Sequence, residues 1–115
     1  MHELSIAMSI VDAAADEAAR RGALQVNAVH LQLGPLSGVI KDALLFSYGI
    51  ACEGTPLAGS RLLIEELPVI TYCSQCAEEQ VIESIQRLAC PQCGELTPEV
   101  VQGRELLVTA LEIEQ

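Results

Sequence analysis

The sequence predicts an α+β fold in which two helices pack on a three-stranded mixed sheet and a small cysteine-rich domain is inserted before the last strand. Three observations support this prediction: two stretches with apolar residues at helical spacing, three stretches of strand composition, and a cluster that holds four of the five cysteines. We therefore expect one α+β domain built from residues 1–70 plus 104–115, and a second domain built from residues 71–103.

The first helix is predicted by apolar residues at the spacing i, i+3, i+4 and i+7, which begin at Leu4 and continue to Ala18. Asp16 and Arg20 stand four residues apart on the other side, where an ion pair supports a helix. Gly22 follows as a natural C-terminal cap. We therefore expect a helix that begins almost at the first residue and ends near residue 21.

A strand and a second helix are expected next. Residues 24–33 are rich in β-branched and apolar types, which favours a strand. The run of glycine, proline and serine at 34–38 should end that strand. An apolar stretch from about Val39 to Cys52 then predicts the second helix.

Two further strands complete the predicted sheet. They are expected at about 61–67 and at 105–114. Leu107, Leu111 and Ile113 stand at even spacings in the last strand, so we expect them to share one face.

The composition limits the classes of partner. The 115 residues include 16 Asp and Glu against 6 Lys and Arg, a formal net charge of −10, and 3% are aromatic. Nucleic-acid binding relies on clustered basic residues and stacking aromatics, and anionic membrane surfaces attract basic segments, so we expect neither partner. Residues 65–115 hold ten acids against two bases, which favours a basic partner, although a solvated acidic face is the simpler alternative.

A cytoplasmic location is expected. The first 22 residues lack a basic segment of the kind that opens an export signal, and Asp12, Asp16 and Glu17 interrupt their apolar residues. The cytoplasm is reducing, so the cysteines are better interpreted as metal ligands or free thiols than as disulfides.

The strongest site signal is a pair of CxxC motifs, Cys73 with Cys76 and Cys90 with Cys93. Each motif brings two sulfurs to one turn, and a segment this small needs such a cross-link because its apolar core is insufficient. Four thiolates suit a structural zinc ion, and this closed set leaves no position for a catalytic water. An iron–sulfur centre or a redox-active dithiol pair is the alternative.

Three further residues, Gly94, Ala77 and Cys52, bear on the roles of the cysteines. Gly94 can adopt a positive φ and turn its N–H toward a sulfur, whereas Ala77 stands where glycine would be more comfortable. Cys52 lies apart, at the end of the second helix, and is interpreted as a small buried apolar residue.

The chain start, Met1-His2-Glu3, is a second candidate site. The amine of Met1 and the amide of His2 can close a chelate ring on a metal ion. The imidazole of His2 and either the amide or the carboxylate of Glu3 can add donors, and such a nitrogen-rich planar set suits Ni(II) or Cu(II). From spacing alone, an ordinary first helical turn is the favoured interpretation. His30 is interpreted as a solvated residue of a strand.

Motifs spread along the whole chain resemble one family, the HypA/HybF nickel metallochaperones. These motifs are Met1-His2-Glu3-Leu4-Ser5, Leu33-Gly34-Pro35-Leu36-Ser37, Glu53-Gly54-Thr55-Pro56, the two CxxC pairs and Gly103-Arg104-Glu105-Leu106. Members of this family mature [NiFe] hydrogenases and, in some organisms, urease.

The resemblance implies a metal-binding role for each candidate site. It implies that nickel is bound by Met1, His2 and Glu3, with His2 essential, in the α+β domain. It also implies a structural zinc in a zinc-ribbon-like domain, bound by the four clustered cysteines: Cys73, Cys76, Cys90 and Cys93. Some relatives carry histidines beside these cysteines; this chain has none after His30, and Glu95 or Glu99 could substitute only as a hypothesis.

The resemblance also implies partners. These are a nickel GTPase, HypB, and the precursor of the [NiFe] hydrogenase large subunit. The oligomeric state stays open, and a homo-oligomer is one option.

The sequence allows comparison with two other classes of function. A zinc-ribbon protein-interaction module without metal transport would make the Met-His-Glu start incidental. An enzyme is not expected, because the sequence has no Ser/His/Asp set, no glycine-rich phosphate loop and no open metal site.

Overall fold

The computed structural model describes residues 2–115, and the chain divides into two compact units. The first unit contains the chain up to Leu31, Val39–Glu65 and Leu107–Gln115. The second unit contains Gln32–Gly38 and Glu66–Leu106. Each unit is built around a three-stranded sheet.

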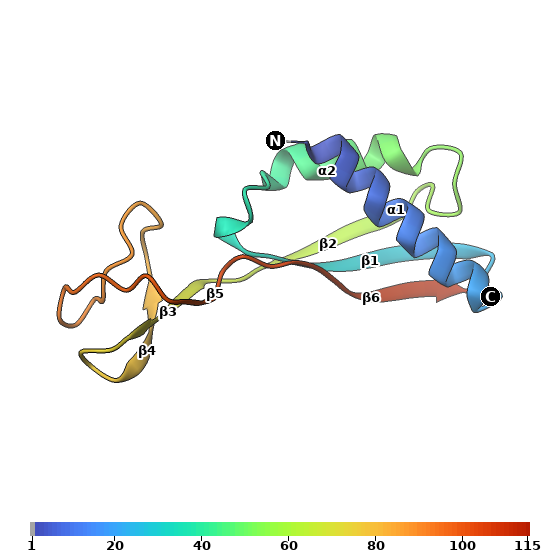
Figure 1. The fold of residues 1–115 in the computed structure, drawn as a ribbon. Helices are drawn as coiled ribbons and strands as arrows, with labels where there is room; N and C mark the ends of the chain where they lie inside the picture. Colours follow the sequence, from blue (N-terminus) through green and yellow to red (C-terminus); the bar gives the residue numbers. More distant parts are fainter. Residues whose placement is uncertain (1) are drawn as a thin grey trace. The chain divides into compact units, whose positions relative to one another are not determined.

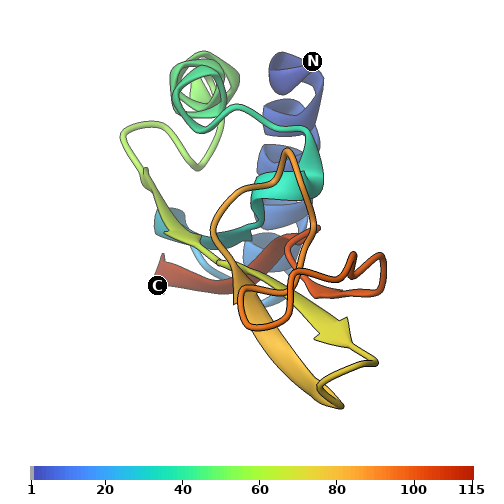
Figure 2. The ribbon, with the colours of Figure 1, turned by 90° about the vertical axis from the view of Figure 1, so that its left-hand side faces the viewer.

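The first unit packs two helices on one face of a mixed sheet, which confirms the predicted fold class. The helices are α1 (Glu3–Arg20) and α2 (Lys41–Cys52). The sheet has the strand order β2-β1-β6, with β1 at Gln25–Leu33, β2 at Arg61–Glu66 and β6 at Leu106–Glu114. Figures 1 and 2 show both helices on the same side of this sheet. The ends of these elements differ from the predicted ends by only one or two residues.

Small and branched aliphatic side chains build the core of this unit. Its buried members are Ala7, Ile10, Val11, Ala14, Ala18, Val26, Val29, Leu31, Leu44, Tyr48, Cys52, Leu57 and Leu62. The alanines of α1 let its backbone lie close to α2 and to the sheet, and each buried Leu, Ile or Val side chain contributes roughly 1.5–3 kcal/mol. Neither described helix has the length and apolar content that crossing a membrane requires.

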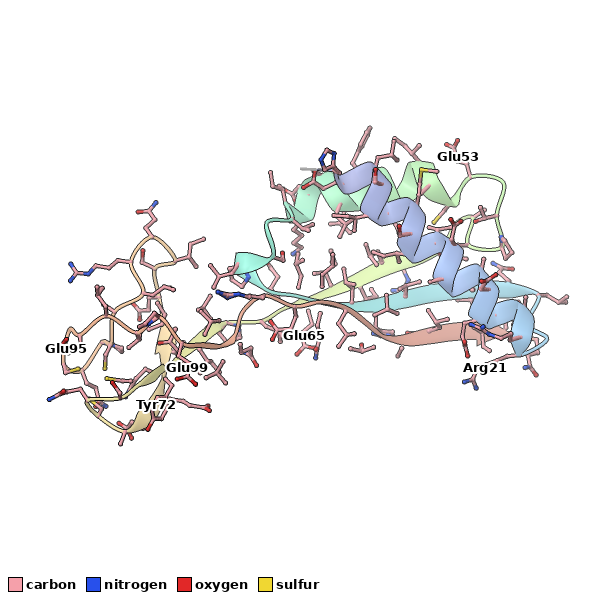
Figure 3. All side chains as sticks on the ribbon, in the orientation of Figure 1. Arg21, Glu53, Glu65, Tyr72, Glu95 and Glu99 are labelled. Carbon is pink, nitrogen blue, oxygen red and sulfur yellow. The ribbon has the colours of Figure 1, made fainter. Side chains whose placement is uncertain are left out.

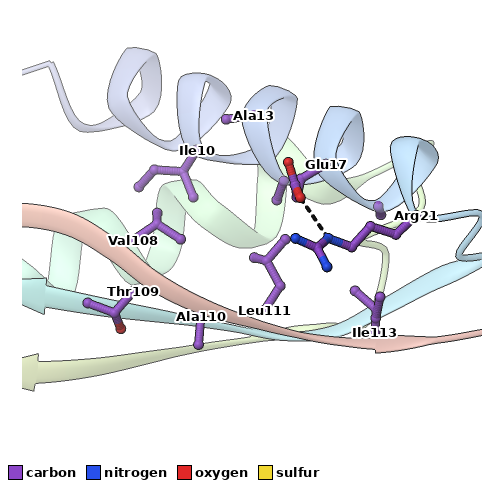
Figure 4. A pocket seen from close by; sticks show the side chains of 11 residues that line it. Ile10, Ala13, Glu17, Arg21, Val108, Thr109, Ala110, Leu111 and Ile113 are labelled. Atoms are coloured by element: carbon purple, nitrogen blue, oxygen red, sulfur yellow. Dashed lines mark hydrogen bonds and ion pairs between the residues drawn. The ribbon is translucent and has the colours of Figure 1, made fainter.

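The predicted face of β6 was correct at one end and wrong at the other. Leu111 and Ile113 pack against the core as expected, but Leu107 is 53% exposed. In Figure 4, Val108 and Leu111 both lie on the side of β6 that faces α1. Strict alternation would place residues three apart on opposite faces, so β6 contains a bulge-like shift between them that moves Leu107 out of the predicted face.

Two glycines allow close backbone contact in the second unit. The Leu36 N–H donates to the Gly103 carbonyl at 2.8 Å, and the Gly34 N–H donates to the Glu105 carbonyl at 2.8 Å. A Cβ at Gly34 would overlap the Gly103 carbonyl oxygen, and Gly103 itself has a φ of 136°. The run at 34–38 does end β1, as predicted, and forms a single turn of 3₁₀-helix at Pro35–Ser37.

The second unit contains three short strands that the sequence analysis missed. They are β3 (Val69–Cys73), β4 (Glu78–Ile82) and β5 (Val100–Gln102), in the order β4-β3-β5. Both pairings of β3 are antiparallel. The polar residues of β4 hide its strand character, because only Ile82 in it is buried.

Candidate metal sites

Two hairpins position the four clustered cysteines. Cys73 is the last residue of β3 and is paired with Glu78 of β4, so the first CxxC motif forms the turn between these strands. The second motif lies at the tip of another hairpin, in which the Thr97 N–H donates to the Leu88 carbonyl and the Cys90 N–H donates to the Glu95 carbonyl. The tetrad is thus assembled from two local turns, which is why its spacing was recognisable in the sequence.

The sulfur geometry fits one tetrahedral ion. The Sγ atoms of Cys73 and Cys93 are 3.6 Å apart, those of Cys76 and Cys90 are 3.9 Å apart, and all four lie within 4.8 Å of one another. A tetrahedral zinc with Zn–S bonds of about 2.3 Å separates its sulfurs by about 3.8 Å. All five cysteines are free thiols, because a disulfide would need sulfurs about 2.05 Å apart. Four sulfurs this close surround a single ion better than a cluster of several irons.

The electrostatics of the tetrad also favour a bound cation. Desolvation raises the pKa of the Cys90 thiol, but backbone hydrogen bonds from Cys93 and Gln92 outweigh it and bring this pKa to about 7. The hydrogen bond with Cys93, together with desolvation, raises the pKa of Cys76 to about 12. One thiolate therefore forms readily while its neighbour resists ionisation. A divalent cation at the centre would stabilise all four thiolates together.

The backbone angles of the turns around the tetrad agree with those expected from the sequence, but one predicted hydrogen bond is wrong. Ala77 has a φ of 57° and is the sole non-glycine residue with positive φ in the described part of the chain, so it does occupy a glycine-like position. Gly94 has a φ of 78°, as expected. However, its N–H donates to the Cys90 carbonyl at 2.9 Å rather than to a sulfur. The N–H that lies near a sulfur in the first motif belongs to Cys76, 3.4 Å from Cys73 Sγ.

A buried pair of hydroxyls supports the second hairpin and was not foreseen. Thr71 Oγ1 donates to Thr97 Oγ1 at 2.8 Å, and Thr97 Oγ1 donates to the Leu88 carbonyl at 3.1 Å. Both threonines are almost fully buried. They connect β3, near Cys73, with the segment that follows the second CxxC motif. The signal in the sequence was the alternation of Val69, Thr71 and Cys73, which places Thr71 on the buried face.

The N-terminal candidate lies at the start of α1. Met1 lies outside the described residues. His2 is the N-cap residue of α1, its carbonyl accepts the N–H of Ile6 at 3.0 Å, and its side chain is exposed. Glu3 is the first residue of the helix and is 7% exposed. The structure therefore exposes the side chain of His2 and buries that of Glu3, its neighbour in the sequence.

The carboxylate of Glu3 has a structural role that the sequence did not suggest. Its Oε2 accepts the backbone N–H of Ile40, the N-cap residue of α2, at 3.1 Å. This hydrogen bond lowers the pKa of Glu3, against the opposing effect of desolvation. Glu3 thus connects the starts of the two helices across 37 positions of sequence, a contact that no local pattern could reveal.

The remaining candidates have ordinary surroundings. His30 Nε2 lies 2.6 Å from Glu112 Oε2 on neighbouring strands, and its side chain is 39% exposed. Cys52 is 3% exposed within the core, which agrees with its interpretation as a buried apolar residue. Glu95 and Glu99 are exposed side chains of the second unit (Figure 3).

Comparisons with known proteins agree across the whole chain. The family described as "Hydrogenase/urease nickel incorporation, metallochaperone, hypA" matches residues 1–113. The chain is 50% identical to Hydrogenase maturation factor HypA of Chloroflexus aurantiacus, over 97% of this chain and 98% of that protein. It is 47% identical to the HypA of a Roseiflexus species, over 99% of this chain and 93% of that protein.

The fold has a counterpart among solved structures. The solution structure of the Ni metallochaperone HypA from Helicobacter pylori superposes with a TM-score of 0.68 at 21% identity, and the alignment covers 99% of this chain and 98% of that one. Together with the family match over nearly every residue, the sequence identities decide the assignment: the chain belongs to the HypA family of hydrogenase and urease nickel-incorporation metallochaperones.

Proposed function

We propose that this protein is a nickel metallochaperone that binds Ni(II) at Met1, His2 and Glu3 and delivers it, with the nickel GTPase HypB, to the precursor of the [NiFe] hydrogenase large subunit. The observation that carries the proposal is membership of the HypA family over residues 1–113, which include the Met-His-Glu start. The cytoplasm is the proposed location.

The surroundings of the N-terminus support a specific choice of donors. The carboxylate of Glu3 is buried and accepts the Ile40 N–H, so its use as a ligand would break the connection between the helices. The amide nitrogens of His2 and Glu3 lie at the start of α1, next to the amine of Met1 in the sequence. The nickel set therefore combines the amine of Met1, the imidazole of His2 and backbone amide nitrogens. Binding displaces protons from these groups, so acid releases the metal.

The cysteine tetrad is proposed to hold a structural zinc ion. Cys73, Cys76, Cys90 and Cys93 supply a closed set of soft ligands at tetrahedral distances. The ion would hold together the two hairpins of residues 71–103, which we propose as the smallest zinc-dependent folding unit. Residues 1–70 plus 104–115 would then form the nickel-binding domain.

The proposed delivery is tested in a host whose own copy of this gene has been deleted. Wild type and His30→Ala should restore hydrogenase activity and the nickel content of the large subunit, whereas His2→Ala should restore neither. His30 is the matched control because it is the other histidine of the chain and is not a proposed ligand. Full rescue by His2→Ala would reject the proposed nickel site. It would favour an interaction module that transports no metal.

A further inference from the structure

The last strand of the first unit has an open edge. Within the part of the chain that the structure describes, β6 pairs with β1 on one side and is one of the two edge strands of its sheet. Edge strands usually carry a lysine, a proline or a bulge-forming glycine that discourages further pairing. The stretch Leu106–Glu114 contains no lysine, proline or glycine, and its bulge-like shift lies between Val108 and Leu111, so Leu111–Glu114 keeps a regular alternation of half-buried and exposed side chains. Leu107 and Val108 are instead 53% and 37% exposed.

An apolar groove runs beside this edge. It has a volume of about 480 Å³ and lies between α1 and β6. Its floor and walls include Ile10, Ala13 and Ala14 of α1 and Leu111 and Ile113 of β6 (Figure 4). The alanines leave the space open, because a larger side chain at those positions would fill it.

One end of the groove is bounded by an ion pair. Arg21 Nε lies 2.7 Å from Glu17 Oε2, and both residues line the groove. This contact pairs the two charged residues that line the groove, and Glu17 also binds Arg20 at 3.0 Å. The groove side of β6 therefore favours apolar side chains.

The other face of the same edge is acidic. Leu111 and Ile113 face the core, so the alternating residues Glu112 and Glu114 face the opposite side of the sheet. Glu112 lies 2.6 Å from the ring of His30 and is 51% exposed, and Glu114 accepts a hydrogen bond from Asn27 at 3.3 Å. Two carboxylates thus stand along the edge on the side away from the groove.

We propose that the edge of β6 binds an extended segment of a partner protein in which apolar and basic residues alternate. The segment would add to the sheet as a further strand and pair with β6 through backbone hydrogen bonds. Its apolar side chains would enter the groove beside Leu111 and Ile113. Its lysines or arginines would lie across from Glu112 and Glu114, where opposite charges stabilise neighbouring strands. The residues of this site are not among those proposed to bind a metal.

Charge distinguishes this partner from a second copy of the chain. Leu106–Glu114 contains two glutamates and no basic residue, and the whole chain carries a net charge of −10. A second β6 would therefore bring further acidic residues to an acidic edge, whereas a basic segment is attracted to it.

The proposal is tested with synthetic peptides and the full zinc-bound chain. The probe is a fluorescent peptide of alternating valine and lysine. One control has the same composition with the valines and lysines in separate blocks, and another alternates valine and glutamate. The alternating valine–lysine peptide should bind at least about tenfold more tightly than either control, and its binding should slow amide hydrogen exchange in β6. Equal binding of the block peptide would overturn the proposal, because charge attraction alone would then explain it.

Matched variants locate the site. Ala13→Glu should weaken binding of the alternating valine–lysine peptide, and Ala19→Glu should leave it unchanged, since both alanines are exposed on α1 but only Ala13 lines the groove. The double change of Glu112→Lys and Glu114→Lys should transfer the preference to the valine–glutamate peptide. Wild-type binding by Ala13→Glu would overturn the proposal. So would self-association through β6 that no peptide displaces, because a second copy would then be the occupant.

Discussion

At the scale of single residues, a polar cluster at the end of α2 shows how a buried tyrosine is accommodated. Tyr48 is 3% exposed, and its hydroxyl lies 2.7 Å from Ser60 Oγ. Cys52 Sγ lies 3.8 Å from the same hydroxyl oxygen of Ser60. Burial raises the pKa of Tyr48 from 10.0 to about 12. The folded protein therefore binds the phenolic proton more tightly than the unfolded chain does.

This shift predicts a loss of stability in alkali. The contribution of Tyr48 is complete below pH 10, the unfolded value, and is lost as the pH rises to about 12, the folded value. Tyr48→Phe removes the titrating group, so its urea midpoint should fall less between these two pH values than that of wild type. At neutral pH the same variant should be less stable by about 1 kcal/mol, because the hydrogen bond with Ser60 is lost. Parallel pH profiles for the two proteins would contradict this account.

At the scale of elements, the turn after β1 depends on the absence of a side chain. Gly34 lies against the backbone of Gly103, and the intervening hydrogen bonds hold the 3₁₀-turn at Pro35–Ser37 close to the residues that precede β6. Steric fit, rather than a positive φ, explains glycine at position 34, because its φ of −96° suits any residue.

Gly34→Ala should therefore destabilise the protein by about 1–3 kcal/mol, the usual cost of overpacking. Gly49→Ala is the matched control, because Gly49 lies in α2 and an added Cβ there would meet nothing within 4 Å. That change should stabilise the helix by roughly 0.5–1 kcal/mol. Urea denaturation of both variants measures the difference, and equal midpoints for the two variants would refute the steric explanation.

The second unit has a small core, so its elements are proposed to depend on the metal ion held by the cysteine tetrad. Its buried side chains within residues 66–106 are few: Val69, Thr71, Cys73, Ile82, Cys90 and Thr97. Two of these six are tetrad cysteines and two are threonines. A structural zinc ion contributes on the order of 10 kcal/mol to such a fold, more than the few apolar side chains supply.

Removal of zinc by a strong chelator should therefore unfold the second unit while the first keeps its helices. Hydrogen exchange should accelerate in β3 and β4, and the helical circular dichroism of α1 and α2 should persist. Cys73→Ser should have the same effect. Cys52→Ala should retain the zinc, because Cys52 belongs to the other core. Retention of protected amides in β3 after chelation would show that the unit folds without metal.

At the scale of the whole molecule, the sequence predicted features that depend on neighbouring residues, and it missed contacts between residues that are far apart in the chain. The apolar stripe of α1 and the two CxxC spacings are local patterns, so the α+β fold and the tetrad were both recognised. The strand β4 was missed because its sequence is mostly polar, with Glu78, Glu79 and Gln80. The contacts of Glu3 with Ile40 and of Thr71 with Thr97 join residues 37 and 26 positions apart, and no periodicity reports such pairs. Membership of a metallochaperone family confirms the expectation that the chain is not an enzyme.

The most direct test of the central claim is a titration of Ni(II) into the zinc-bound chain with its native N-terminus. Wild type and His30→Ala should each bind a single nickel ion, and His2→Ala should bind it at least about tenfold more weakly because the imidazole is lost. A residue added ahead of Met1 should also weaken binding, because it removes the free amine. Unchanged affinity and stoichiometry in His2→Ala would contradict the proposal that the N-terminus carries the nickel.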